Sequence, residues 1–213
     1  HMGSDLSVVN AARVSMHKES VWANDSDGWI EGKLLDKDIK LINYLAKHNH
    51  WTPFAHAFLS FRIKVPMFVA MQLDKHTVGV VTNSVSRRYV DEEPEFWYPK
   101  TLRNKAVNIK QGSEGEHKDT DMWISFMKSI DESRVDNYMD MITEGVAPEM
   151  ARMVLPMNTM TERIWSGSLA AFSRVCKLRL DPHSQKEIQE LAGALAALVE
   201  PLFPHSWKAL SEN

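Results

Sequence analysis

The chain has 213 residues, of which 44% are hydrophobic and 25% are charged, so it can bury a core and is too apolar for wholesale disorder. Its net charge of −3 argues against nucleic-acid binding through a global basic field, although a local basic pocket stays open. The single cysteine, Cys176, excludes an intramolecular disulfide and a thiolate zinc cluster, and the nine histidines lack the spacing of a zinc protease. We therefore expect no metal site.

No stretch of the sequence suggests a membrane anchor. No run approaches the roughly 18 apolar residues that span a bilayer. The opening residues His1-Met2-Gly3-Ser4 lack the hydrophobic region of a signal peptide. We therefore expect a cytoplasmic protein.

The first half of the chain predicts two helices around one strand. Asp36–His48 carries apolar residues at helical spacing, and Phe58–Val65 alternates apolar and polar residues as a strand with one wet face does. Met67–Lys75, which follows a proline, is expected to be a helix buried on most sides. Val78–Val81 contains Gly79 and suits neither state, so we expect a turn or a strained connection there.

The middle of the chain predicts a polar excursion followed by helices. Asp91–Gly115 is polar and contains two prolines. Thr120–Thr143 is expected to be a long amphipathic helix, Pro148–Val154 a short helix and Thr159–Val175 a further helix. The apolar stripe of the long helix comprises Trp123, Phe126, Ile130, Tyr138 and Ile142.

The C-terminal part predicts a short extended segment and a final helix. Lys177–Leu180 alternates and is expected to be extended, and Asp181-Pro182 supplies an N-cap followed by proline at the first helical position. Pro201 ends this helix, whose expected buried face comprises Ile188, Leu191, Leu195 and Leu198. Together the elements predict a single α+β domain over residues 1–213, mostly helical, with a small antiparallel sheet.

Two polar stretches flank the predicted strand. His50–His56 (HWTPFAH) either ends a helix and turns at Pro53 or carries a function. Gln72–His76 and Asn83–Tyr89 bracket the Gly79 turn with basic and hydroxyl residues, a combination that phosphate oxygens prefer. The alternative is a solvated basic loop that pairs with neighbouring carboxylates, namely Asp91, Glu92 and Glu93.

Two further stretches carry arginines. Arg152 lies in an apolar stretch and needs an anionic partner if it is buried, which leaves Glu149, Glu162 or a ligand. Arg174–His183 brings three cations to a predicted helix start, whose free N–H groups favour anions. A polar helix entry without a ligand is the alternative.

Cys176 is the one thiol available for nucleophilic chemistry. It lies between Val175 and Leu178, and no activating histidine is predictable beside it. We therefore favour a buried, inert thiol.

Four of these stretches, taken in order, resemble the flavin-dependent thymidylate synthases, and the resemblance runs from about Ser4 to Trp207. The loop HNHWTPFAH is similar to the family's His-x-x-Thr/Ser-Pro-Phe-x-His element. The segment from Gln72 to Tyr89 is similar to its signature of basic residues followed by Asn-x-x-Ser-x-Arg-Tyr. ARMVLPMNTMTERIW and KLRLDPHSQ are similar to its two C-terminal elements.

The resemblance implies a reaction and an assembly. Such enzymes are homotetramers that hold FAD at subunit junctions. NADPH reduces the flavin, methylenetetrahydrofolate supplies one carbon, and dUMP is methylated at C5 to give dTMP without an enzyme cysteine. The resemblance implies no nucleic-acid or membrane partner.

The resemblance also assigns site residues by position. It implies that dUMP is bound by Gln72, Ser86, Arg87, Arg88, Arg152 and Arg179. The residues implied to contact FAD are Thr52, Lys75, His76, Thr77, Asn83, Ser168, Arg174 and His183. The implied catalytic residues are Arg179, Ser86 and His50, of which His50 would lie near the flavin ring. An arginine near the uracil carbonyls would stabilise the charge that develops as C5 becomes nucleophilic.

The sequence departs from the family pattern at several points. Lys75-His76-Thr77 stands where the signature usually begins Arg-His-Arg, and one extra residue precedes Asn83. Ser84 and Ala55 replace common acidic residues, and Ser168 and Arg174 also differ from the commonest pattern. The chain begins close to the family's first helix, so we expect the family's N-terminal strand to be missing.

These departures keep three other hypotheses open. The first is methylation of another uridine nucleotide, such as UMP. The second is a nucleotide-binding relative without catalysis. The third is an assembly module whose basic clusters pair with neighbouring subunits.

Overall fold

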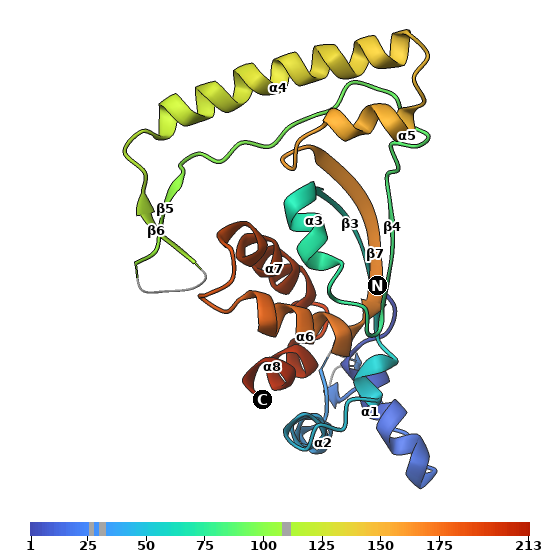
Figure 1. Ribbon diagram of the computed structural model, residues 1–213. Helices are drawn as coiled ribbons and strands as arrows, with labels where there is room; N and C mark the ends of the chain where they lie inside the picture. Colours follow the sequence, from blue (N-terminus) through green and yellow to red (C-terminus); the bar gives the residue numbers. More distant parts are fainter. Residues whose placement is uncertain (26–27, 30–32, 108–111) are drawn as a thin grey trace. The chain divides into compact units, whose positions relative to one another are not determined.

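The computed structural model describes residues 1–25, 28–29, 33–107 and 112–213 (Figure 1). The chain packs into two compact units that interleave along the sequence. The terminal unit comprises His1–Phe61, His76–Val81 and Trp165–Asn213, and the central unit comprises Arg62–Lys75 and Thr82–Ile164. The mostly helical α+β architecture with a small antiparallel sheet is confirmed. Within the described ranges, no helix has both the length and the apolar character that a membrane span requires.

The terminal unit is built mainly from helices. Its helical and hairpin elements are α1 (Asp5–Arg13), η1 (Val14–Met16), β1 (Asn24–Asp25), β2 (Gly28–Trp29), α2 (Asp36–Lys47), η2 (Pro53–Ala55), α6 (Leu169–Arg179), α7 (Lys186–Val199) and α8 (Pro204–Glu212). The predicted helix α2 is confirmed, and it turns Ile42 and Leu45 inward while packing against α8. The buried Asp5 carboxylate accepts the N–H groups of His205 and Ser206 at 2.8 and 2.9 Å. It therefore caps the start of α8 from a distant part of the chain.

The central unit is organised around one long helix. Its elements outside the three-stranded sheet are α3 (Met67–Leu73), β5 (Arg103–Lys105), β6 (Ser113–Glu116), α4 (Thr120–Thr143), α5 (Pro148–Ala151) and η3 (Arg152–Val154). Asp131 of α4 is buried and accepts hydrogen bonds from Tyr98 Oη at 3.0 Å, Asn158 Nδ2 at 2.8 Å and Arg134 Nη1 at 2.9 Å. Burial and this hydrogen bond raise the pKa of Tyr98 to about 12. The network joins α4 to the irregular segments around it.

Three longer strands form the small sheet. The strand order is β3 (Phe58–Pro66), β7 (Met160–Ser168) and β4 (Val80–Ser84) (Figure 1). Leu169 N–H donates to the Ala57 carbonyl at one end of the β3–β7 pair, and Met67 N–H donates to the Thr159 carbonyl at the other. This register shows that β7 runs antiparallel to β3. The predicted strand at Phe58–Val65 is confirmed, and each of the three strands has residues in both units.

The helix predicted over Thr159–Val175 is wrong in its first half. Met160–Ser168 is the central strand, and α6 begins only at Leu169. Side chains along β7 alternate, with Thr161, Arg163 and Trp165 buried. A buried arginine interrupts the apolar period of two, and the pattern is therefore hidden in the sequence.

Two predictions next to the second polar stretch need correction. α3 is confirmed, but Met67 and Met71 are exposed while Val69, Ala70 and Leu73 are buried, so only one side is covered. Gly79 adopts a φ of +76°, which confirms the turn at that position. The strand β4 nevertheless begins immediately afterwards, at Val80. Part of the predicted excursion Asp91–Gly115 forms β5 and the start of β6, and residues 108–111 lie outside the described residues.

The helix α4 is confirmed, but its apolar stripe is buried only in part. Tyr138 is fully buried, whereas Trp123 and Phe126 are 43% and 54% exposed. Their rings contact each other edge to face.

The C-terminal predictions fail in three places. Lys177–Leu180 is not extended, because α6 continues to Arg179. α7 begins at Lys186 instead of Pro182. Its buried face comprises Ile188, Ala192, Leu195 and Val199, whereas Leu198 is exposed. It is also not the final helix, since α8 follows.

Candidate functional site

His76 and Arg179 meet within the terminal unit. Arg179 Nε donates to His76 Nε2 at 2.8 Å. Burial, and secondarily the Arg179 guanidinium, lower the pKa of His76 below its ordinary 6.5. The imidazole is therefore neutral at pH 7, which leaves Nε2 free to accept the hydrogen bond.

A tight backbone crossing holds the loop that follows His76. Ser168 N–H donates to the Gly79 carbonyl at 3.1 Å, and a Cβ on Gly167 would lie 2.7 Å from that same oxygen. Arg174 Nη2 donates to the Val78 carbonyl at 3.0 Å. The loop is thus fixed against the junction of β7 and α6, and only glycine fits at Gly167 without a shift of the backbone.

Other predicted residues near this crossing have distinct environments. Ser168 is buried, and its Oγ accepts the N–H of Ala171 at 3.2 Å, so it serves as the N-cap of α6. Arg174 and Thr77 are exposed. Arg174 forms no ion pair with a carboxylate in the part of the chain that the structure describes. Its positive charge is therefore available to an anion.

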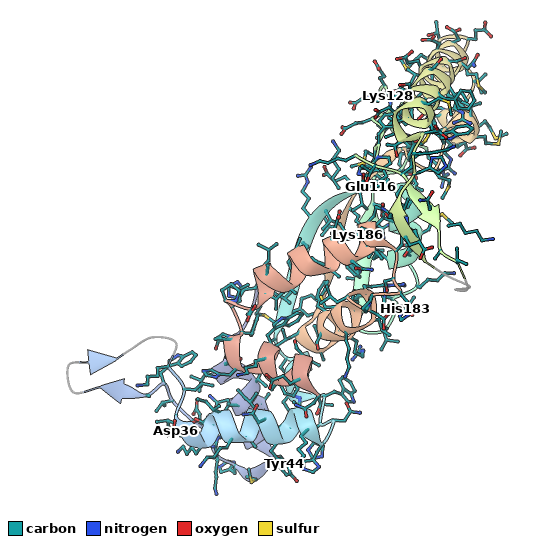
Figure 2. All side chains as sticks on the ribbon, turned by 90° about the vertical axis from the view of Figure 1, so that its left-hand side faces the viewer. Asp36, Tyr44, Glu116, Lys128, His183 and Lys186 are labelled. Carbon is teal, nitrogen blue, oxygen red and sulfur yellow. The ribbon has the colours of Figure 1, made fainter. Side chains whose placement is uncertain are left out.

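The turn before α7 differs from the predicted helix start. His183 donates its backbone N–H to Asp181 Oδ1 at 2.8 Å, and its Nδ1 lies 2.9 Å from the same oxygen. The backbone hydrogen bond is the main reason that the pKa of Asp181 is lowered. Ser184 N–H donates to the Asp181 carbonyl, so these N–H groups are already used by the turn. The exposed His183 ring lies on the approach to α7, close to Lys186 in sequence (Figure 2).

The histidine loop leaves its rings at the surface. Tyr44 on α2 contacts the rings of His48 and His50 at centroid distances of 4.3 and 6.0 Å (Tyr44 is labelled in Figure 2). His48, His50 and Thr52 are exposed, and Asn49 adopts a φ of +54°. The segment follows the end of α2, as the structural alternative predicts. It also presents His50 and Thr52 to solvent, as a functional role requires.

In the central unit, Glu149 brings two predicted arginines together. Arg88 Nε pairs with Glu149 Oε2 at 3.2 Å, and Arg152 Nε donates to the Glu149 backbone carbonyl at 3.2 Å. Arg152 is exposed, so it needs no buried anionic partner, and Glu162 pairs with Arg62 instead. The carboxylate of Glu149, which we expected to pair with Arg152, therefore pairs with Arg88.

Arg87 and Ser86 are held locally. Arg87 Nη1 donates to the Glu92 carbonyl at 2.8 Å, and its guanidinium lies over the Tyr138 ring at 5.5 Å. Ser86 Oγ accepts the N–H of Arg88 at 3.4 Å. Arg87 and Arg152 both line a cavity of about 350 Å³, together with Lys64 and the carboxylate residues Glu92, Glu95 and Glu162.

Three predicted residues of the central unit lie along α3 and β4. Gln72 is half-buried on α3, Lys75 is exposed just beyond the end of α3, and Asn83 is exposed on β4. Lys75 has no hydrogen bond or ion pair in the described ranges of the chain.

Two residues beside the predicted site were not predicted from the sequence. They are Arg163 and Asp74, and Arg163 Nη1 donates to Asp74 Oδ1 at 2.6 Å. Arg163 interrupts the apolar alternation of β7, and its partner Asp74 lies 89 positions away in sequence, so no sequence pattern indicated this pair. The Val78 carbonyl that orients Arg174 is a backbone group, which no residue type reveals.

Cys176 is buried within α6. Its Sγ donates to the Ala192 carbonyl at 3.6 Å, and burial raises its pKa to about 12. The thiolate that a nucleophile requires is therefore absent at neutral pH.

Comparison with known proteins defines the class to which this fold and these stretches belong. The family model described as "Thymidylate synthase complementing protein" matches residues 1–205. A flavin-dependent thymidylate synthase of Thermus thermophilus is 36% identical over 100% of this chain and 73% of its own length. That of Thermosipho africanus is 36% identical over 98% of this chain and 86% of its own.

A solved structure supports the same class. The crystal structure of the UMP/dUMP methylase PolB from Streptomyces cacaoi, bound with 5-Br dUMP, matches with a TM-score of 0.82 at 26% identity. The match covers 99% of this chain and 91% of that chain. The fold and motifs therefore define an enzyme of this structural class. The chain belongs to the thymidylate synthase complementing protein family, that of the flavin-dependent thymidylate synthases, and the resemblance drawn from the four motifs is confirmed.

Proposed function

We propose that this enzyme is a flavin-dependent thymidylate synthase that methylates dUMP at C5 to give dTMP. FAD and NADPH serve as cofactors, and methylenetetrahydrofolate is the carbon donor. The observation that carries the proposal is the likeness of nearly the whole chain to PolB, a methylase solved with a bromo-dUMP ligand. We extend the proposal to a single functional domain over residues 1–213 that works as a cytoplasmic homotetramer, without nucleic-acid or membrane partners.

The cationic side chains of the terminal unit suit an anionic flavin dinucleotide. Arg174 is exposed and is oriented by a neutral carbonyl, so a diphosphate can take its remaining donors. A Cβ on Gly79 would lie 3.2 Å from Ala171 Cβ, and the φ of +76° also favours glycine at this turn beside Arg174. When bound, FAD supplies the redox chemistry of the reaction. The residues proposed to hold it are Thr52, Lys75, His76, Thr77, Asn83, Ser168, Arg174 and His183.

Arg88 suits the nucleotide phosphate. The side chains of Arg88 and Glu149 are 54% and 51% exposed. Such a surface pair contributes about 0–1 kcal/mol to stability. A phosphate dianion forms shorter, bidentate bonds to a guanidinium, so dUMP can displace Glu149 from Arg88. The residues proposed to bind the nucleotide are Gln72, Ser86, Arg87, Arg88, Arg152 and Arg179.

Arg179 is the proposed source of electrostatic catalysis, with Ser86 and His50 as the further catalytic residues. Its hydrogen bond to the neutral His76 orients the guanidinium. Directed at a uracil carbonyl, the positive charge of Arg179 stabilises the negative charge that forms as C5 becomes nucleophilic. Cys176 takes no part, because its thiol is buried and protonated.

An absorption spectrum of the purified protein before and after NADPH tests the proposal most directly. We expect flavin bands that bleach when NADPH is added, and dTMP formation when dUMP and methylenetetrahydrofolate follow. A yellow protein that never oxidises NADPH in the presence of dUMP and folate would favour a nucleotide-binding relative without catalysis.

UMP is the second candidate substrate. Ser84 ends β4 and Ala55 ends η2, two positions where the motifs commonly carry acidic residues. PolB, which the chain resembles in fold, is described as acting on both UMP and dUMP. Turnover of dUMP and UMP should be compared side by side, and a strong preference for UMP would overturn the assignment of dUMP.

A further inference from the structure

Arg163 is a buried charge in the central strand. Its side chain is only 5% exposed, and it lies on the same face of β7 as the buried Thr161 and Trp165. A guanidinium removed from water needs a partner, whereas an apolar residue would fill this position without one. An arginine here is therefore unfavourable for core packing, and its role must be sought in what it contacts.

The partner of Arg163 is Asp74, the C-cap residue of α3. Arg163 Nη1 donates to Asp74 Oδ1 at 2.6 Å, and both residues belong to the central unit. Arg163 Nε is buried without a hydrogen-bond partner in the described residues, so the guanidinium is not held by a wider polar network. Asp74 is 52% exposed. A carboxylate at a helix C-terminus also opposes the helix dipole, so Asp74 benefits from the cation beside it.

Asp74 lies between two of the proposed ligand residues. Gln72 precedes it by two positions on α3, and the exposed Lys75 follows it directly. The N–H of Asp74 donates to the Ala70 carbonyl at 3.1 Å, which is the last hydrogen bond of the helix. The ion pair therefore fastens the end of α3 to β7 at the point where the chain presents Gln72 and Lys75.

We infer that Arg163 is a positioning residue that acts through Asp74 to set the place of Gln72 and Lys75 for their anionic ligands. This inference rests on the proposed function. Arg163 itself is buried, so it touches neither substrate nor cofactor. The ion pair between the buried Arg163 and the half-exposed Asp74 provides a fixed position for the helix end in place of a stronger core.

Arg163→Met is the main test. The methionine side chain is apolar and similar in length to the aliphatic part of arginine, so it can fill the buried position, and Asp74 stays in contact with water. We expect a folded protein in which amides 73–75 exchange hydrogen faster. The KM for dUMP should rise by about tenfold, the loss of one charge-assisted contact, while kcat stays within about twofold. Arg163→Lys keeps the cation and should recover most of the affinity. Arg62→Met removes an exposed ion pair to Glu162 on the same sheet and should change neither measurement.

Two results would overturn the inference. One is unchanged amide exchange at the end of α3 in Arg163→Met, and the other is faster exchange with an unchanged KM for dUMP. If Arg163→Met does not fold, Asp74→Ala removes the exposed partner of the pair instead, and an unchanged KM for dUMP in that variant would overturn the inference equally. If the protein without any substitution neither binds nor converts dUMP, the proposed function is refuted, and so is the ligand role of Gln72 and Lys75. The exchange measurement then still decides whether Arg163 fastens α3.

Discussion

Arg174 and Arg179 in the terminal unit are oriented in a different way from Arg88 in the central unit. In the terminal unit, Arg174 donates to a backbone carbonyl at 3.0 Å and Arg179 donates to the neutral imidazole of His76 at 2.8 Å. In the central unit, Arg88 pairs with the carboxylate of Glu149 at 3.2 Å. A neutral acceptor orients a guanidinium and leaves its charge intact, whereas a carboxylate neutralises it until another anion takes its place.

This difference bears on how an acidic protein can bind anions. With a net charge of −3 the chain has no global attraction for nucleotides, so local arrangement decides. The terminal unit presents a preoriented charge at Arg174. The central unit presents Arg88 in an exchangeable ion pair. The exposed carboxylate of Glu149 balances the charge of Arg88 when no ligand is bound.

Replacement of Arg179 should have the largest effect, because it removes an oriented charge from the proposed nucleotide site. Arg179→Ala is expected to weaken dUMP binding by about 1.5–3 kcal/mol, the range for a hydrogen bond to a charged group. Calorimetric titration with dUMP measures the loss, and the melting temperature serves as a control for folding. Unchanged affinity in a folded variant would contradict the proposed role.

The neutrality of His76 can be tested through pH. Burial and Arg179 lower the pKa of His76 below the 6.5 of an unfolded chain, so the unfolded state binds the proton more readily. The stabilisation is therefore complete above pH 6.5 and is lost as the pH falls through the pKa of the folded state. His76→Gln keeps a neutral acceptor for Arg179 and removes the titration.

Melting temperatures recorded from about pH 7.5 to 5 separate the two proteins. We expect the unchanged protein to lose more stability than His76→Gln as the pH falls. Parallel profiles would show that His76 does not titrate in this range, and the hydrogen bond to Arg179 would then need another explanation.

The sequence could predict those elements whose pattern is local. The helix α2 and the strand β3 show clean apolar periods, and both are found where expected. The strand β7 is hidden from a search for apolar alternation because Arg163 interrupts it. A buried charge is invisible in a pattern of hydrophobic residues, and only its partner explains its presence.

The site could be predicted by residue type and motif, but its pairing could not. Arg88 and Glu149 are 61 positions apart, and nothing in the sequence favours Glu149 over the nearer Glu92 or Glu93. The N–H groups predicted at a helix start beside His183 are occupied by the turn at Asp181. Such pairings depend on tertiary contacts, which periodicity does not describe.

A smaller effect, with the opposite sign, is expected on the carboxylate side of the comparison. Glu149→Gln releases Arg88 from its ion pair and should strengthen dUMP binding by up to about 1 kcal/mol, the upper range for an exposed pair. The gain should shrink at high salt, because exposed charges are screened. Glu212→Gln removes the exposed pair to Lys208 on α8 and serves as the matched control. Weaker binding by Glu149→Gln would mean that Glu149 itself contributes to the ligand site.

The smallest effect on activity is expected when Cys176 is replaced. This replacement tests whether a thiol nucleophile, in addition to the oriented cations, is needed to activate the pyrimidine. The thiol is buried with a pKa of about 12 and donates to the Ala192 carbonyl at 3.6 Å, so it offers neither a thiolate nor access to substrate. Cys176→Ala should lower stability by about 1 kcal/mol through the buried volume that it removes and leave the rate of dTMP formation unchanged. A folded variant without turnover would point to a thiol nucleophile. Neither the preoriented cations nor the exchangeable pair would then account for activation of the pyrimidine.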